Sequence, residues 1–341
     1  MKLAGISMIG NDADVVEAFV RHTLALLDHL FIIVHCPQDG TREILDALQA
    51  EGLPITLVLD NEPAFLQGER LTWLAREAWT AIQPDFAFLL DADEFIVPPE
   101  RPVIEAALAA LPPGVLAAGI PLRTFVPTSE DAADEAHPVR RIQHRVRDER
   151  AVCKMVLTRA FVADTSWAID HGNHGLQKLG SAMHLTVPGL RRLALAHYPV
   201  RSGAQVTNKT ILGYLAHLAA GRPGVEERRI ATHWRRCYDE MVLQGKTRGM
   251  SEQQLVAWFH RRPDLQPREA ELVLDPTPAP APLRYAHLMR NDPYSTLARF
   301  TEALIRSRPG NLDGVRFDYV SGDAPGAGST APGAAQDGQP R

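Results

Sequence analysis

Short apolar runs alternate with amphipathic helical patterns along the first hundred residues. Runs of strand length lie at residues 3–8, 30–34, 55–59 and 86–90. Helical patterns separate them: one follows Asp14 and Glu17, which resemble a capping box, one begins at Thr41 as N-cap, and one covers residues 69–82. Strands that alternate with helices predict an α/β fold whose mainly parallel sheet is flanked by helices.

The pattern loosens after Pro98 and becomes helical after Pro199. We expect a helix at 103–111, strands at 115–122, 151–161 and 193–198, and an acidic loop at 126–140 that could cover a pocket. Helical patterns follow at 202–220, 226–243, 251–260 and 294–306. The predicted organisation is a sheet domain over residues 1–200, a helical C-terminal region over 201–320 and a disordered tail over 321–341, where apolar side chains are few.

Composition narrows the class of protein. The 341 residues are 45% hydrophobic and 23% charged, as in ordinary soluble proteins, and a net charge of -5 argues against a nucleic-acid partner. The three cysteines, Cys36, Cys153 and Cys237, form no C-x-x-C pair, so we expect reduced thiols in a cytoplasmic protein. Polar residues from Asn11 onward come too early for a signal peptide, and no apolar run is long enough to span a bilayer. Any contact with the inner membrane would therefore be peripheral.

An acidic cluster follows the fourth apolar run directly. Asp91, Asp93 and Glu94 lie within four residues of one another, and three carboxylates at the end of a buried strand repel each other unless a cation lies between them. Mg²⁺ or Mn²⁺ binds carboxylates together with substrate phosphates, so the cluster predicts a metal and a phosphorylated ligand. The alternative is a solvated acidic turn.

Polar residues follow the other predicted strands as well. In open α/β sheets, ligands bind beyond the carboxyl ends of the strands. The residues expected to converge there with the acidic cluster are Asn11, His35, Asp39, Asp60 and Asn61.

Several segments resemble bacterial glycosyltransferases of the family 2 type, in the branch that carries D-x-D-E-F. Residues 91–95 match that motif fully, residues 35–41 resemble the N-x-S-x-D-G-T turn, and residues 10–22 resemble K-N-E-x-x-x-x-x-E-W-x-x-H with three departures. Later motifs are resembled by Lys154 within 153–156, by 170–174, and by 197–202 with Gln205 and Lys209. The resemblance covers residues 3–215 and leaves out the helical remainder.

This resemblance implies a GT-A fold, a UDP- or GDP-linked sugar donor, a glycan or lipid-linked acceptor, a Mn²⁺ or Mg²⁺ cofactor, and inversion at the anomeric carbon. Polysaccharide synthesis is the process that such an activity would serve. The implied metal ligands are Asp91, Asp93 and His197. The implied donor-binding residues are Asn11, Asp39, Asp60, Asp91, Lys154, Arg201 and Lys209.

The acceptor side rests on a polar cluster at residues 170–174. An inverting transfer needs a carboxylate base, and Asp170 is the candidate, with His171, His174 and Glu94 as acceptor-binding residues. The usual family base motif, a Glu-Asp pair after D-x-D, is not recognisable here. The cluster could instead be a turn that only binds hydroxyls.

Structural roles remain open for most of these residues. His197 could be a packed core histidine, Asp39 a turn former, and Glu94 a residue that holds its loop through backbone N–H groups. Arg201 and Lys209 could be solvated charges at the start of a helix.

Two other functions would also use paired carboxylates. A nucleotidyltransferase usually carries a Gly-rich loop with Arg or Lys after its first strand, and none is evident here. A non-catalytic carbohydrate- or Ca²⁺-binding protein would use the acidic cluster as a structural ion site.

Overall fold

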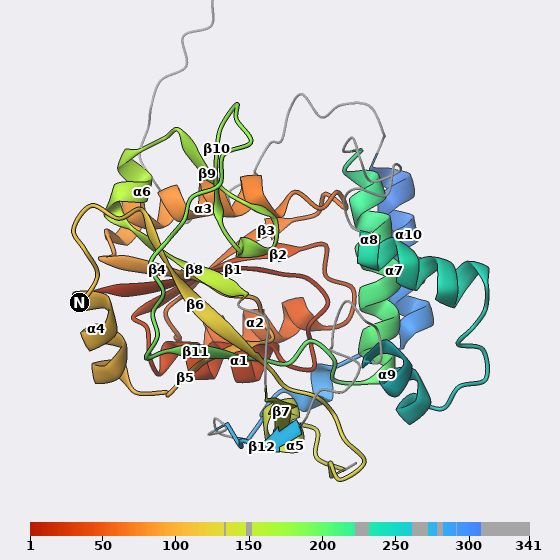
Figure 1. The fold of residues 1–341 in the computed structure, drawn as a ribbon. Helices are drawn as coiled ribbons and strands as arrows, with labels where there is room; N and C mark the ends of the chain where they lie inside the picture. Colours follow the sequence, from red (N-terminus) through yellow and green to blue (C-terminus); the bar gives the residue numbers. More distant parts are fainter. Residues whose placement is uncertain are drawn as a thin grey trace, which may run out of the picture.

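An eight-stranded mixed sheet forms the centre of the molecule (Figure 1). The computed structural model describes residues 1–132, 134–147, 152–221, 232–260, 272–277, 282–290 and 292–307. The strand order is β3-β2-β1-β4-β8-β6-β11-β5. Strands β1 to β4, β6 and β11 run in one direction, whereas β8 and β5 run against their neighbours. The predicted α/β fold class, with a mixed and mainly parallel sheet flanked by helices, is confirmed.

The first half of the sheet follows the predicted alternation closely. Its elements are β1 (Leu3–Ile9), α1 (Val16–Leu24), β2 (His29–His35), α2 (Thr41–Ala50), β3 (Ile55–Asp60), α3 (Gln67–Ile82) and β4 (Phe86–Leu89). The second half adds β5 (Glu94–Val97), α4 (Arg101–Ala109), β6 (Ala117–Thr124), β8 (Cys153–Thr158), α6 (Arg159–Ala163) and β11 (Ala194–His197). Smaller elements are α5 (Pro138–Arg141), β7 (His144–Val146), β9 (Trp167–Ile169), η1 (His171–Asn173), β10 (Leu176–Lys178) and β12 (Leu272–Leu274).

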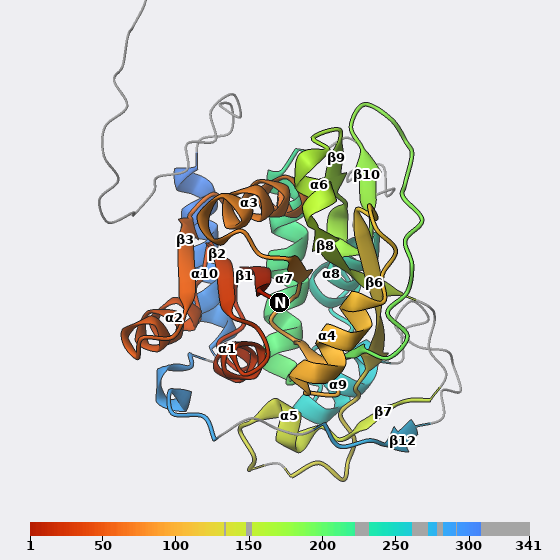
Figure 2. The ribbon, with the colours of Figure 1, turned by 90° about the vertical axis from the view of Figure 1, so that its left-hand side faces the viewer.

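Helices cover both faces of the sheet, and each face has its own apolar core (Figure 2). Helices α1, α2 and α4 pack on one face, while α3 and α6 pack on the other. Side chains of β1 alternate between the two cores, with Leu3 and Ile9 in one and Ile6 and Met8 in the other. Burial on both sides explains why these strands read as continuous apolar runs.

The helical C-terminal extension stands at the carboxyl ends of the parallel strands (Figure 1). It consists of α7 (Gly203–Ala219), α8 (Thr232–Tyr238), the π-helix η2 (Asp239–Leu243), α9 (Glu252–His260), the short η3 (Ala286–Leu288) and α10 (Pro293–Arg306). Leu212 of α7 and Phe300 of α10 pack with Cys36 at the end of β2. These contacts join the extension to the sheet and do not test a domain boundary. The division at residue 200 therefore stays a prediction.

Two predicted helix caps are wrong. Val15, not Asp14, precedes α1, and its apolar side chain offers no cap. Asp14 pairs with Arg201 instead, and Glu17 accepts hydrogen bonds from the backbone of Arg284 and Tyr285 rather than closing a capping box. Gly40 rather than Thr41 caps α2, with φ of 98°. A Cβ on Gly40 would lie 2.2 Å from the carbonyl oxygen of Leu288, so the close approach of the later chain explains the glycine.

Other predicted boundaries shift. The strand expected at 151–161 ends at Thr158, whose hydroxyl accepts a hydrogen bond from Ala160 N and caps α6. The loop expected at 126–140 contains the start of α5, and Arg141 there donates to the carbonyl of Arg201 at 2.6 Å. Residues 226–231 and the tail at 321–341 lie outside the described residues.

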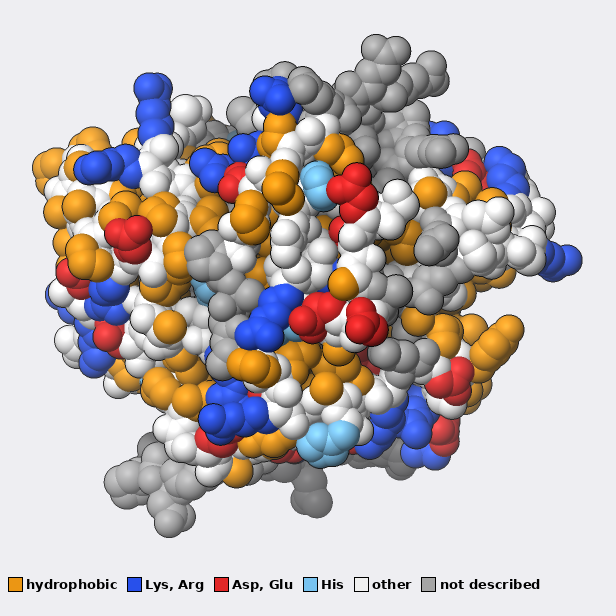
Figure 3. Space-filling view, turned by 90° about the horizontal axis from the view of Figure 1, so that it is seen from below, with side chains coloured by type: hydrophobic (Ala, Val, Ile, Leu, Met, Phe, Trp, Pro, Cys, Tyr) orange, Lys and Arg blue, Asp and Glu red, His pale blue; other side chains and the backbone are white. Residues whose placement is uncertain are grey.

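Charges of both signs are interspersed with apolar side chains on the face seen from below (Figure 3). That distribution agrees with the small net charge of the sequence. Among the helices of the described ranges, none combines the length and apolar character that a bilayer-spanning segment needs.

Acid is expected to destabilise the fold through His22. Burial lowers the pKa of His22 to about 4, although its Nε2 lies 3.0 Å from the carbonyl of Ile96. The unfolded chain binds that proton near pH 6.5, so the free energy of unfolding should fall between about pH 6.5 and 4, by up to ~1.4 kcal/mol per pH unit. Urea denaturation at several pH values should show a shallower fall for His22→Gln. Equal slopes for the two proteins would contradict this account.

Candidate functional site

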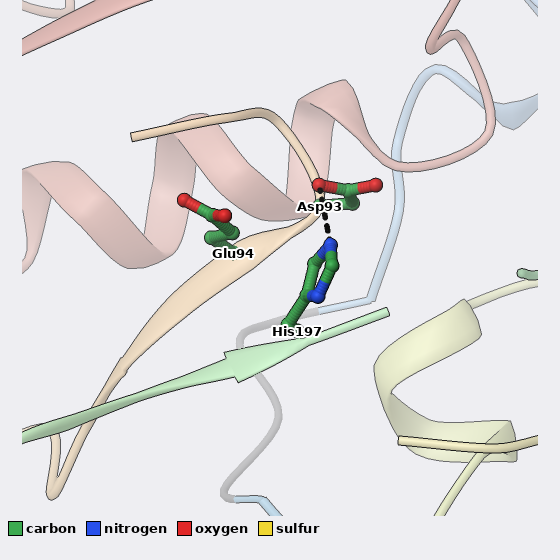
Figure 4. Close-up of side chains that lie close together, drawn as sticks. All are labelled: Asp93, Glu94 and His197. Atoms are coloured by element: carbon green, nitrogen blue, oxygen red, sulfur yellow. Dashed lines mark ion pairs between the residues drawn. The ribbon is translucent and has the colours of Figure 1, made fainter. Parts of the chain in front are cut away.

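The acidic cluster lies in the turn between β4 and β5, beside the end of β11. Strand β5 pairs antiparallel with β11, with Glu94 opposite His197, so the two strands bring His197 beside the turn. His197 Nε2 lies 3.7 Å from Asp93 Oδ1 (Figure 4). One ligand atom each of Asp93, Glu94 and His197 lies within 4.8 Å of the others. Asp93 and Glu94 are buried.

Two cations from the C-terminal segment contact Asp93. Lys209 Nζ lies 2.9 Å from Asp93 Oδ2, and Arg201 Nη1 lies 3.3 Å from the same oxygen. Burial opposes ionisation of Asp93, but Lys209, His197 and Arg201 outweigh it and hold the pKa of this carboxyl far below its usual range. Asp93 is therefore a carboxylate at neutral pH.

Arg201 joins this cluster to the turn after β1. Its side chain is fully buried and lies 2.7 Å from Asp14 Oδ2 and 3.1 Å from Asp12 Oδ1. Burial alone would lower the pKa of Arg201, but Asp14, Asp12 and Asp93 raise it. The alternative that Arg201 is a solvated charge is wrong. Lys209 is about one-third exposed, with 34% of its side chain accessible.

Lys154 neutralises the other end of the acidic cluster. It lies on β8, which is an interior strand, so it is not at a sheet edge. Its buried ammonium donates to Asp91 Oδ2, and it lies 3.2 Å from Glu94 Oε1. Asp91 Oδ1 also accepts hydrogen bonds from Gln67 and Asn173. Both carboxylate oxygens of Asp91 are thus hydrogen-bonded to protein side chains, while Glu94 lies with Asp93 and His197 in the group with metal-ligand spacing.

The site carries more negative than positive side chains, which favours binding of a divalent cation. Five carboxylates, those of Asp12, Asp14, Asp91, Asp93 and Glu94, face three cations, those of Lys154, Arg201 and Lys209. With all of them ionised, five negative and three positive charges leave a net charge of two negatives; with Glu94 protonated, which its pKa of about 8 favours at neutral pH, the net charge is one negative. Burial and the neighbouring Asp91 and Asp93 raise the pKa of Glu94, although Lys154 opposes the rise. A divalent cation bound here would offset the repulsion between the buried carboxylates. The carboxylate oxygens and the imidazole nitrogen suit Mn²⁺ or Mg²⁺ as ligands.

The predicted metal set is therefore reproduced in part by geometry. Asp93 and His197 lie together as expected, Glu94, for which acceptor binding is predicted, lies with them, and Asp91 lies beside Lys154. Glu94 also accepts from the backbone N–H of Asp91 at 3.0 Å, which is the structural role left open for it. Metal ligation by any of these residues stays a prediction.

The remaining donor-side residues lie at the carboxyl ends of the strands and hold the loops there. Asn11 Oδ1 accepts from Gln38 N at 2.7 Å, and Asp39 accepts from Ala13 N at 3.0 Å. Burial raises the pKa of Asp39 to about 6, although hydrogen bonds from Thr41 and Ala13 favour its carboxylate form. Asp60 pairs with Arg70, a buried arginine of α3 that sequence reasoning missed.

The 170–174 segment is tied directly to Asp91. Lys154 Nζ donates to Gly172 O at 2.7 Å, and Gln67 Oε1 accepts from Gly172 N at 2.9 Å. Asp170 caps η1 by accepting from His171 N at 2.7 Å. His174 Nδ1 lies 3.0 Å from the carbonyl of Cys153. The predicted acceptor cluster therefore borders the acidic cluster.

Several site residues escaped the sequence analysis. They are Asp12, Asp14, Gln67, Asn173 and His184. Asp12, Asp14 and Asn173 lie within segments that resemble family motifs, which was the available signal. Gln67 and His184 had none.

No protein-family model and no curated protein matches the chain. Solved structures show weak likeness. TarS 1-349 from S. aureus, in complex with UDP, is 12% identical over 76% of this chain and 78% of that chain, with a TM-score of 0.36. Mannosyltransferase PcManGT from Pyrobaculum calidifontis, in complex with GDP-Man and Mn²⁺, is 19% identical over 35% of each chain, with a TM-score of 0.29.

A third structure is a nucleotide-binding enzyme of another kind. CMP:2-keto-3-deoxy-manno-octonic acid synthetase, complexed with CTP, is 13% identical over 48% of this chain and 76% of that chain, with a TM-score of 0.27. These scores and identities are low, so the function proposed below rests on the site itself.

Proposed function

We propose that the protein is a metal-dependent glycosyltransferase that moves a sugar from a nucleoside diphosphate to a hydroxyl-bearing acceptor. The observation that carries this proposal is the group Asp93, Glu94 and His197 with Lys209 beside it, at the carboxyl ends of parallel strands. Carboxylates with a surplus negative charge suit a divalent metal, and a part-exposed ammonium beside them suits the phosphates of a nucleotide ligand.

Asp93, Glu94 and His197 would hold Mn²⁺ or Mg²⁺. When bound, the ion would neutralise charge that develops on the departing nucleoside diphosphate. Lys209 would turn from Asp93 to the diphosphate, and Arg201 would keep the Asp93 carboxylate in place from its buried position. Lys154 would fix Asp91, which would then face the ribose.

Asn11, Asp39 and Asp60 would shape the loops around the nucleoside. Asp170, His171 and His174 would lie on the acceptor side, next to Asp91. Inversion is the proposed stereochemical outcome, and a glycan or lipid-linked acceptor is proposed on the family resemblance. The three free cysteines support a cytoplasmic location.

A donor panel tests the proposal. Purified protein with Mn²⁺ is incubated with UDP-glucose, UDP-N-acetylglucosamine, UDP-galactose and GDP-mannose, and released nucleoside diphosphate is measured with and without EDTA. Metal-dependent release from at least one donor is expected. Release of pyrophosphate from nucleoside triphosphates and sugar phosphates would point to a nucleotidyltransferase. Calcium binding without any nucleotide effect would point to a binding protein.

Lys209→Met is expected to strengthen Mn²⁺ binding in the absence of nucleotide. The Lys209 ammonium lies 2.9 Å from Asp93 Oδ2 and competes with the ion for that carboxylate. Removing one positive charge at a part-exposed site should raise Mn²⁺ affinity on the order of tenfold, and the same change should weaken nucleoside diphosphate binding. Calorimetry with each ligand measures both effects. Lys246→Met, at an exposed lysine, is the control, and weaker Mn²⁺ binding by Lys209→Met would contradict the competition.

A further inference from the structure

A histidine that no family motif indicated lies beside Asp170. His184 Nδ1 is 3.3 Å from Asp170 Oδ2, and 57% of the histidine side chain and 28% of the aspartate side chain are exposed. A surface pair of this kind contributes little to stability. The pair lies next to the predicted acceptor cluster, so we consider a role in the reaction.

Both partners are held by their backbones. Asp170 N donates to Gly175 O at 3.0 Å, and Asp170 Oδ1 accepts from His171 N at 2.7 Å. His184 forms a β-bridge with Gln177 of the β9–β10 hairpin, which stands above β8 (Figures 1 and 2). The hydrogen bonds Lys178 N to Met183 O and Leu185 N to Leu176 O flank this bridge. Backbone hydrogen bonds therefore hold the main chain of both residues in place.

The same frame is joined to the acidic cluster. Gly172, two residues from Asp170, accepts from Lys154 and donates to Gln67, and both of these contact Asp91. Asp170 therefore lies in the segment proposed for the acceptor side, and His184 lies beside it.

The placement of the two side chains suits one chemistry. His184 Nδ1 is the ring nitrogen near the Asp170 carboxylate, and a proton on that nitrogen would leave Nε2 with its lone pair. A carboxylate behind an imidazole stabilises the imidazolium that forms when Nε2 takes up a proton.

We propose that His184 takes the proton of the acceptor hydroxyl and that Asp170 orients its ring, an inference that rests on the proposed glycosyl transfer. The acceptor oxygen forms a bond with the anomeric carbon as its proton moves to His184 Nε2. The bond from that carbon to the phosphate oxygen breaks, and its electron pair leaves on the nucleoside diphosphate. The imidazolium then releases the proton to solvent. Asp170, which the sequence suggested as the base, becomes a positioning residue.

The test uses the full chain with Mn²⁺, the four nucleotide sugars of the donor panel, and water or octyl glucoside as acceptor. His184→Gln is expected to lower nucleoside diphosphate release by about 100-fold or more, the usual contribution of a general base. Binding of UDP or GDP with Mn²⁺ should be unchanged, because His184 contacts no residue of the acidic cluster in any interaction described above. His287→Gln, at an exposed histidine on η3, should match the wild type.

Chemical rescue separates catalysis from structure. Added imidazole should restore part of the activity of His184→Gly, because the exposed position admits the free base. Imidazole should not restore Asp170→Asn, which keeps its histidine but loses the carboxylate.

Two results would overturn the inference. They are full activity of His184→Gln, whether or not Asp170→Asn is inactive, and failure of imidazole to rescue His184→Gly. Each can arise while the wild type releases nucleoside diphosphate, so the proposed function would survive. A wild type that turns over no donor would overturn the proposed function itself, and this inference with it.

Discussion

Asp93→Asn is expected to abolish both sugar transfer and metal-dependent nucleotide binding. Asp93 is buried, and its carboxylate contacts His197, Arg201 and Lys209, which come from β11, the following turn and α7. An asparagine keeps the shape but removes the charge that would hold a divalent cation. Loss of a metal that neutralises a leaving group should lower turnover by at least about 100-fold to 1,000-fold.

The measurement is nucleoside diphosphate release, together with calorimetric binding of UDP or GDP in the presence of Mn²⁺. Asp46→Asn, at an exposed aspartate of α2 that pairs with Arg42, is the matched control and should behave as the wild type. Because the cations around residue 93 lose their partner, circular dichroism must show that Asp93→Asn is folded. If Asp93→Asn is not folded, Asp93→Glu, which keeps the negative charge, is used as a second variant. Wild-type turnover by a folded Asp93→Asn protein would remove the metal from the proposal.

Lys154→Met is expected to cause the largest loss of stability. The Lys154 ammonium is buried on an interior strand between Asp91 and Glu94, and these carboxylates raise its pKa against the effect of burial. Removing one partner from a buried ionic network leaves uncompensated charge, which costs about 3–5 kcal/mol. Gly172 O would also lose its hydrogen bond, so the 170–174 segment should loosen.

Urea denaturation at neutral pH measures this effect. Lys178→Met, at an exposed lysine of β10, is the control and should change the free energy of unfolding by only about 0.5 kcal/mol. Adding Glu94→Gln to Lys154→Met removes one of the stranded carboxyls and should recover part of the loss. A Lys154→Met protein as stable as the wild type would show that the network does not hold this site together.

The periodic part of the fold was readable from the sequence. Strands β1 to β4 and helices α1 to α3 fall where the apolar runs and helical patterns predicted them, because strands buried on both faces and amphipathic helices leave clear local signals. Ser202 accepts from Gln205 N and caps α7, as the boundary at residue 202 indicated. Capping at Asp14 and Thr41 failed because their side chains have other partners. Asp14 pairs with Arg201, and the Thr41 hydroxyl donates to Asp39 and accepts from the backbone N–H of Asp12.

Patterns along the chain predict the alternation of strands and helices, the acidic turn after β4, and the polar residues at the carboxyl ends of the strands. These are consequences of spacing along the chain, and spacing is what a sequence displays. The contacts between charged residues distant in sequence depend on the tertiary structure. Arg201 and Lys209 lie 108 and 116 residues from Asp93, and they reach it because β5 pairs with β11 and α7 follows that strand. Such contacts depend on strand order and register, which are settled by long-range pairing and leave no local pattern.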